Sequence, residues 1–331
     1  MDVNLISKFR RQFNYKKRDL SWLLGMSKGF FKQARGARLL IYHGICLKDH
    51  TRFNPIFLTN RIFEEHLKFY KKYFHLVSLE EYYTGQFNKD RFNICITFDD
   101  GYANNLKYVL PLMEKYQVPV CFFITAIRKA GYDILWNDFL GIVTKYGPEQ
   151  LMYQNKQFRK DKFGRYASVE TGNTLVDYLK ENGFSKKEEM IRQLKPLFKP
   201  GTHEDDYWLQ MTEEEIKKLS TSKFATIGSH GYFHNRMDKL PIESATEEMR
   251  VSKQFLEGIT GKEITSFAFP YGNYSRSIVE VAKKIGYKQL LAMDFFYQED
   301  SNDPALRERL TVNPFISVNN QMHAIVTGQY E

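Results

Sequence analysis

Short apolar runs alternate with longer, more polar stretches along the chain from about residue 38 onward. This alternation is typical of strand and helix units around a parallel sheet, and it favours a barrel or a doubly wound sheet. The predicted strands are 38–42 (RLLIY), 93–98 (NICITF), 118–125 (VPVCFFIT), 224–228 (FATIG), 264–269 (ITSFAF), 287–292 (YKQLLA) and 310–313 (LTVN).

Two helix starts have a clear signature. Ser78 with Glu81, and Thr212 with Glu215, each fit a capping box, in which the two side chains satisfy backbone N–H groups at the start of a helix. The stretch at about 140–209 breaks the alternation, because it is rich in Lys and Glu and predicts helices without a strong strand. We therefore expect a basic arm at 1–37 and one domain at 38–331 that contains this insertion.

The composition is that of a globular protein. The 331 residues are 43% hydrophobic and 26% charged, which is enough for one large domain or two small ones. Cys46, Cys95 and Cys121 form no CxxC pair, so neither a disulfide framework nor a zinc–cysteine site is expected, and Cys95 and Cys121 are expected in the core. No run has the roughly 20 apolar residues of a membrane span, and no secretory signal is visible at the start, so the expected location is the cytoplasm.

The net charge of +9 is concentrated in the arm, where residues 1–38 carry +8. These cations are mixed with apolar residues, which are Leu5, Ile6, Phe9, Phe13, Trp22, Leu23 and Leu24. Such a mixture suits peripheral contact with an anionic inner membrane surface, and the alternative is a solvated basic helix packed on the domain. No nucleic-acid reader motif accompanies the charge, so nucleic acid is not an expected partner.

Two of the predicted strands end in groups that can bind a metal. Residues 93–101 (NICITFDDG) end in Asp99 and Asp100, and the run 224–228 leads into SHGYFH, with His230 and His234 four residues apart. Carboxyl ends of parallel strands are where functional groups collect, and the spacing predicts both rings on one side of a helical turn. Two His and one carboxylate leave a coordination position open, as in catalytic zinc sites.

Two further strand ends carry weaker signals. The run 267–272 (FAFPYG) contains Pro270 and a glycine, which fit a loop that holds Tyr271 in a set geometry. At the first strand, His43 within Tyr-His-Gly comes at the position where it would face the same mouth of a barrel. Taken alone, DDG is a turn, and His43 is a structural residue.

The ordered set YHG, TFDDGY, SHGYFH and FAFPYG resembles the polysaccharide deacetylase family, from about residue 39 to 310. The resemblance implies a distorted (β/α) barrel with seven or eight strands. It also implies Asp99 as general base, and Asp100, His230 and His234 as metal ligands. The loop with Pro270 and the Tyr271 amide would hold the oxyanion. Poly-N-acetylglucosamine deacetylases also place Tyr-His on the first strand, which implies His43 as general acid.

The sequence departs from the family in one respect. Many members have an Arg where this chain has Ala268, and that Arg orients the catalytic base. Arg309 is a candidate replacement whose side chain the sequence does not place, and His323 is the alternative general acid.

The resulting hypothesis is a metal-dependent carbohydrate N-deacetylase that cleaves a linear amide C–N bond, with one divalent metal, expected to be zinc. Its expected partner is an N-acetylated glycan, free or lipid-linked. The alternatives are a non-catalytic glycan-binding barrel and a hydrolase of cyclic imides or ureides.

Overall fold

The computed structural model describes residues 3–330, so Met1, Asp2 and Glu331 lie outside the described residues. The strands of the main sheet are β1 (Ala37–Tyr42), β4 (His75–Leu76), β5 (Asn93–Phe98), β6 (Val120–Ile124), β10 (Ala225–Ser229), β11 (Ser266–Ala268), β12 (Gln289–Leu291), β13 (Leu306–Arg307) and β14 (Leu310–Thr311). The α-helices outside the insertion are α1 (Val3–Leu23), α2 (Lys28–Gln33), α3 (Asn60–Tyr73), α4 (Leu79–Tyr83), α5 (Leu110–Tyr116), α9 (Glu213–Ser220), α10 (Ile242–Thr260), α11 (Arg276–Ile285) and α12 (Val318–Thr327).

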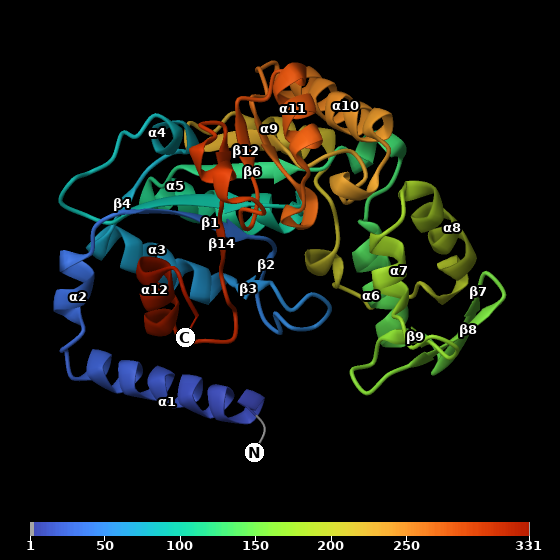
Figure 1. Cartoon of the computed structure of the whole chain (residues 1–331), viewed down its shortest axis with the longest axis horizontal. Coiled ribbons are helices and arrows are strands. Elements are labelled where there is room, and N and C mark those ends of the chain that lie inside the picture. The colour runs from blue at the N-terminus through green and yellow to red at the C-terminus, as the bar shows by residue number, and fades with distance from the viewer. Residues whose placement is uncertain (1–2, 331) are drawn as a thin grey trace.

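The main sheet is parallel and curls into a half-barrel covered by helices (Figure 1). Its strand order is β13-β12-β11-β10-β6-β5-β1-β14, with β4 paired to the start of β5. β13 and β14 stand at the two ends of this order, yet only Glu308 and Arg309 separate them in the chain. The two edges of the sheet must therefore approach each other, and Arg309 lies where they meet. The predicted barrel is confirmed.

Alternate strand residues face opposite sides of the sheet, as the period of a strand requires. Leu39, Cys95, Cys121, Phe123, Ala268 and Leu291 form a small cluster inside the curl with Val77 and with Leu79 of α4. The intervening residues, such as Leu40, Ile96 and Phe122, belong to the large core under the helices. Cys95 and Cys121 are thus buried as predicted, and both predicted capping boxes are present.

The segment between β6 and α9 differs from the expectation of helices alone. It holds the helices α6 (Trp136–Tyr146), α7 (Leu175–Lys180) and α8 (Phe184–Leu194), and also an antiparallel sheet of β7 (Gln150–Tyr153), β8 (Lys156–Lys160) and β9 (Tyr166–Ser168). The prediction of no strand here was wrong. Gln154 and Asn155 both adopt left-handed backbone, which makes the tight turn of a β7–β8 hairpin.

This segment has its own apolar cluster and lies beside the barrel (Figure 1). Its two ends meet at the barrel, because Ile134 bridges Leu209 and Tyr102 bridges Gln210 in antiparallel fashion. Two short strands, β2 (Ile45–Cys46) and β3 (Leu58–Thr59), pair near the same side. The short strands β2, β3, β4 and β13 were not predicted, because two residues carry no periodicity.

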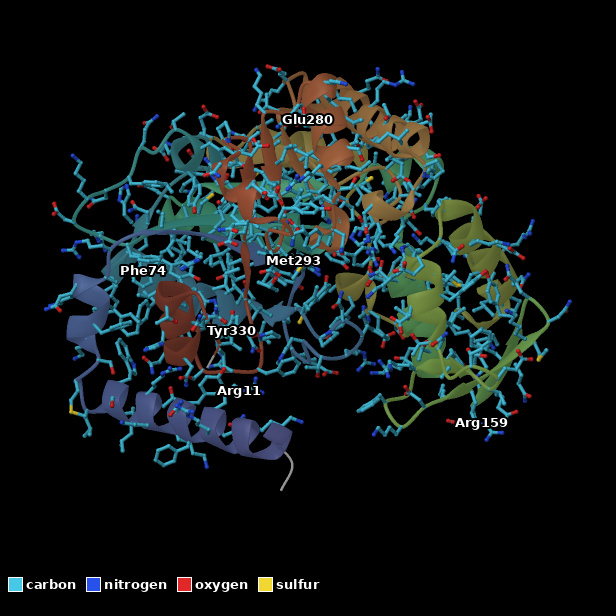
Figure 2. All side chains as sticks on the ribbon, in the orientation of Figure 1. Arg11, Phe74, Arg159, Glu280, Met293 and Tyr330 are labelled. Atoms are coloured by element: carbon cyan, nitrogen blue, oxygen red, sulfur yellow. The ribbon has the colours of Figure 1, made fainter. Side chains whose placement is uncertain are left out.

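Helix α1 lies along the outside of the molecule, next to α12 and α2 (Figure 1). Side chains fill the space between α1 and the barrel (Figure 2). Other side chains of α1 project from the side of the helix that faces away from the barrel. Within residues 3–330, no helix is both long enough and apolar enough to cross a bilayer.

Candidate active site

The alternation inside the barrel brings several polar groups to one mouth. On β1 the inward positions run through Leu39 and Ile41 to His43, and on β5 through Cys95 and Thr97 to Asp99. The register pairs Ile41 with Thr97, and the Asp99 N–H donates to the carbonyl oxygen of Tyr42 at 2.9 Å. His43 and Asp99 therefore end two neighbouring strands on the same side.

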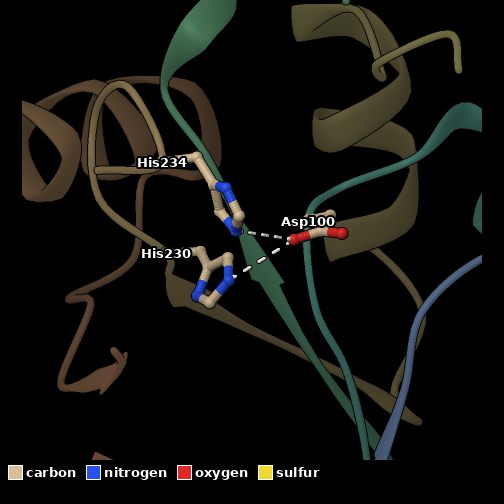
Figure 3. A group of neighbouring side chains, drawn as sticks. All are labelled: Asp100, His230 and His234. Atoms are coloured by element: carbon tan, nitrogen blue, oxygen red, sulfur yellow. Dashed lines mark ion pairs between the residues drawn. The ribbon is translucent and has the colours of Figure 1, made fainter. Parts of the chain in front are cut away.

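Asp100, His230 and His234 meet at this mouth (Figure 3). One ligand atom from each lies within 4.8 Å of the others, and all three residues are buried. The Asp100 Oδ1 atom is 3.4 Å from His230 Nε2 and 3.2 Å from His234 Nε2. Nδ1 of His230 lies 2.8 Å from the Ala268 carbonyl oxygen, which fixes this nitrogen as the N–H and leaves Nε2 as the electron-pair donor. Two imidazole nitrogens and one carboxylate oxygen fit a divalent metal such as zinc.

The two histidines lie in a loop, so the expectation of a helical turn was wrong. β10 ends at Ser229, and both Gly231 and His234 adopt left-handed backbone. Asp100 and Tyr271 share this conformation, with φ of 75° and 60°. Non-glycine residues rarely adopt it, and such residues concentrate at functional sites, where surrounding contacts hold them.

A buried network supports the loop behind His234. Lys187 of α8 donates to the side-chain oxygen of Asn235, and Asn235 donates to the Glu248 carboxylate of α10. The Phe233 N–H also donates to Glu248, at 3.3 Å. Burial lowers the pKa of Lys187 to about 8, although the Glu248 charge opposes this. The segment between β6 and α9 thus contacts the histidine loop directly.

Asp99 is held by Arg309 in a paired, buried contact. Arg309 Nη1 and Nη2 donate to the two carboxylate oxygens of Asp99 at 2.7 and 2.8 Å, and Nη1 also donates to Thr97 Oγ1 at 3.0 Å. Burial raises the pKa of Asp99, but the Arg309 charge and hydrogen bonds lead the opposing effects, and the net pKa is lowered. Asp99 is therefore a carboxylate at neutral pH. The side chain of Arg309, which the sequence could not place, therefore lies against Asp99.

His43 is half-buried and faces the same groups. Burial lowers the pKa of its imidazole, while the charges of Asp100 and Asp99 raise it, and the net pKa is lowered. Its Nδ1 has no hydrogen-bond partner among the residues that the structure describes. The alternative acid, His323, lies elsewhere: it is in α12, and its ring stacks on Phe30 of α2 with centroids 4.9 Å apart. The structure brings His43, and not His323, to the metal-ligand group.

Tyr271 and Pro270 close another side of the mouth. The Tyr271 ring lies 4.6 Å from the His234 ring between centroids. Pro270 is buried and lies beside the glycine that follows His230. The residues Pro270 and Tyr271 therefore touch the histidine loop.

One buried carboxyl group near the ligands was missed. Asp138 of α6 accepts a hydrogen bond from the Tyr102 hydroxyl at 2.9 Å. Burial, and then the Asp100 charge, raise the pKa of Asp138 well above its usual range. Tyr102 follows TFDDG directly, but nothing in the sequence links it to a residue in a distant helix.

A family model described as polysaccharide deacetylase matches residues 87–155 and 169–290. The Streptococcus pyogenes deacetylase PplD in complex with acetate has 14% identity and a TM-score of 0.56, with 87% of this chain and 97% of that chain covered. IcaB from Ammonifex degensii has 15% identity and a TM-score of 0.54, with 89% and 98% covered. The putative polysaccharide deacetylase BA0330 from Bacillus anthracis has 18% identity and a TM-score of 0.54, with 87% and 68% covered. No curated protein sequence matches this chain.

Proposed function

The chain belongs to the polysaccharide deacetylase family, and on that premise we propose that it removes acetyl groups from an N-acetylated glycan by cleaving the linear amide C–N bond. The observation that carries the proposal is the grouping of Asp100, His230 and His234 next to an ionised Asp99 at one barrel mouth. A set of metal ligands and a carboxylate base that is not one of them, in one place, are the parts that amide hydrolysis needs.

The three ligand residues would hold one divalent metal, and zinc is the ion we propose. Such an ion acts as a Lewis acid on a carbonyl group and lowers the pKa of water towards about 7. The His230 contact with the Ala268 carbonyl supports this set, because it orients the ring with Nε2 towards Asp100.

The remaining residues would handle protons and charge. Asp99 takes the proton of the attacking water, and Arg309 keeps this carboxylate ionised and fixed in orientation. His43, in its imidazolium form, gives a proton to the leaving amine, and its lowered pKa makes that form a stronger acid but also less populated at neutral pH. The backbone amide of Tyr271, in the loop with Pro270, donates to the oxyanion. Acetate and a free amino sugar result.

We propose that the glycan is reached from the cytoplasm, either free or lipid-linked. The test is acetate release from a panel of N-acetylated sugars and oligosaccharides, with and without a chelator. The proposal predicts acetate and a new amine in equal amounts, loss of both with chelator, and return with zinc.

Two results would contradict the proposal, and each would favour one of the alternative functions. Binding of glycans without acetate from any of them would indicate a non-catalytic barrel, and ring opening of a cyclic imide or ureide would indicate the other hydrolase class. The control is Arg276→Met, because Arg276 pairs with Glu299 at the exposed surface and should leave the rate unchanged.

A further inference from the structure

Helix α1 is attached to the protein by one face. The buried Tyr15 offers its carbonyl oxygen to Asn320 Nδ2 at 3.2 Å, and the Asp19 carboxylate accepts from Ser317 Oγ at 2.6 Å, both in or next to α12. Trp22 packs its ring against Phe31 and Phe69, with centroids 5.8 and 5.4 Å apart. These contacts fix the rotation of the helix, so its opposite face must point away from the barrel.

That opposite face is apolar, contrary to the expectation for a solvated helix. Five large side chains here are between 58% and 80% exposed, and we call them the α1 outer face: Phe13, Leu20 and Leu23 of α1, with Leu24 and Met26 of the turn that follows it. Phe13 and Leu20 are seven residues apart on one line of α1, and the Leu24 N–H donates to the Leu20 carbonyl oxygen at 3.0 Å, so Leu24 continues that line past the end of the helix. Contiguous exposed apolar patches mark interaction sites more often than isolated residues do.

Cations surround this face. Arg10, Lys16 and Lys17 are exposed and lie three or four residues from Phe13, on the adjoining turns. Lys8 and Arg11 are also exposed but lie on other sides of α1, and Lys28 and Lys32 are exposed on α2. The single acidic residue within 3–38 is Asp19, and it is turned to Ser317 and Asn319.

We propose that the α1 outer face docks on an anionic lipid bilayer, with the helix lying flat in the interface. Apolar side chains enter the boundary between headgroups and acyl chains, and the flanking cations pair with anionic headgroups. Charge complementarity favours this partner over a second copy of the chain, because a symmetric contact of this face would bring its own cations together. A nucleic acid would use the cations and would leave the exposed leucines in water.

The experiment is co-sedimentation of the full chain with vesicles of phosphatidylcholine and phosphatidylglycerol in a 3:1 ratio, compared with pure phosphatidylcholine. We expect binding to the anionic vesicles that weakens as salt is raised. The triple variant Phe13→Ser, Leu20→Ser and Leu23→Ser should bind at least about tenfold more weakly. Lys16→Gln with Lys17→Gln should cost about fivefold for each cation.

The matched control is Met152→Ser with Phe163→Ser, because these side chains are as exposed but belong to the segment of β7 to β9. This control should bind like the unchanged protein. Circular dichroism and acetate release report whether each variant is folded. Equal loss in the control and the triple variant, no binding of the unchanged chain to either vesicle, or a dimer in sedimentation velocity that only the triple variant disrupts would each overturn the proposal.

Discussion

Asp99 and Asp100 are neighbours in the chain, but their side chains have different partners. Asp99 pairs with Arg309, whereas Asp100 lies between His230 and His234. Asp99→Asn should therefore abolish acetate release and leave the bound metal largely in place. Asp100→Asn should reduce both, because it removes a ligand. Elemental analysis and rate measurement on the same samples check this, and identical behaviour of the two variants would contradict the division of roles.

The Arg309 guanidinium holds the pKa of Asp99 low, so its loss should be visible in the pH dependence of the rate. In Arg309→Met the pKa of Asp99 rises, and the acidic limb of the kcat/KM profile should move to higher pH. Breaking a buried pair from one side should also lower the free energy of unfolding by about 3 to 5 kcal/mol.

The double variant Arg309→Met with Asp99→Asn separates the two effects. Because it leaves no unpaired buried charge, it should regain part of the stability that Arg309→Met loses, although it stays inactive. Chemical denaturation measures this difference, and an unchanged acidic limb in Arg309→Met would show that Arg309 does not control Asp99.

His43 is argued to protonate the leaving amine, which is a poor leaving group without a proton. His43→Ala should slow amide cleavage by about 10² to 10⁴ and slow an activated acetate ester far less, with normal metal content. His323→Ala should change little, since its ring packs on Phe30 away from the mouth. The rates of both variants on the amide and on the ester test this assignment. A large amide defect in His323→Ala and a small one in His43→Ala would make His323 the acid.

At the scale of elements, the longer strands were predictable because their positions are apolar and their ends carry unusual groups. β5 was predicted at its observed bounds, and β1, β6 and β10 within about two residues. The HxxxH helical turn failed because local spacing does not reveal left-handed residues such as His234. The Arg309–Asp99 and Tyr102–Asp138 contacts join distant segments, and a single sequence gives no signal for such pairing.

The turn after β1 depends on a glycine. A Cβ atom added at Gly44 would lie 2.1 Å from the Phe57 ring, so Gly44→Ala should force Phe57 or His43 to move. We expect a loss of about 1 to 3 kcal/mol in the free energy of unfolding. The control is Gly29→Ala in α2, where a Cβ meets nothing within 4 Å and helix propensity favours alanine. Denaturation curves compare the two, and equal stability of both variants would contradict the crowding at Gly44.

At the scale of the whole molecule, a buried histidine affects resistance to acid. His66 of α3 lies 3.0 Å from the Tyr42 hydroxyl, and burial lowers its pKa to about 3. Between pH 6.5 and about 3, the unfolded chain binds a proton there that the folded chain does not. Stability is therefore lost as pH falls, by about 1.4 kcal/mol per pH unit from this group.

His66→Gln removes this proton uptake, so its stability should depend less steeply on pH over the same range, even if its stability at pH 7 is lower. Denaturation at several pH values, with chelator in all samples, gives both slopes. If the free energy of unfolding changes with pH equally steeply in both proteins, His66 does not contribute to the loss of stability in acid.

The position of Arg309 in the chain also determines when its contact with Asp99 can form during synthesis. Asp99 is translated early, whereas its partner residue and β14, which pairs with β1, come more than two hundred residues later. On the ribosome, the growing chain holds an unpaired Asp99 and an open edge on β1 until residue 309 has emerged. Contacts between residues so far apart in the chain form slowly. Until they form, the unpaired edge of β1 can pair with other chains and lead to aggregation. Until residues 309–311 have been made, the nascent chain thus lacks both the partner of Asp99 and the strand that pairs with the edge of β1.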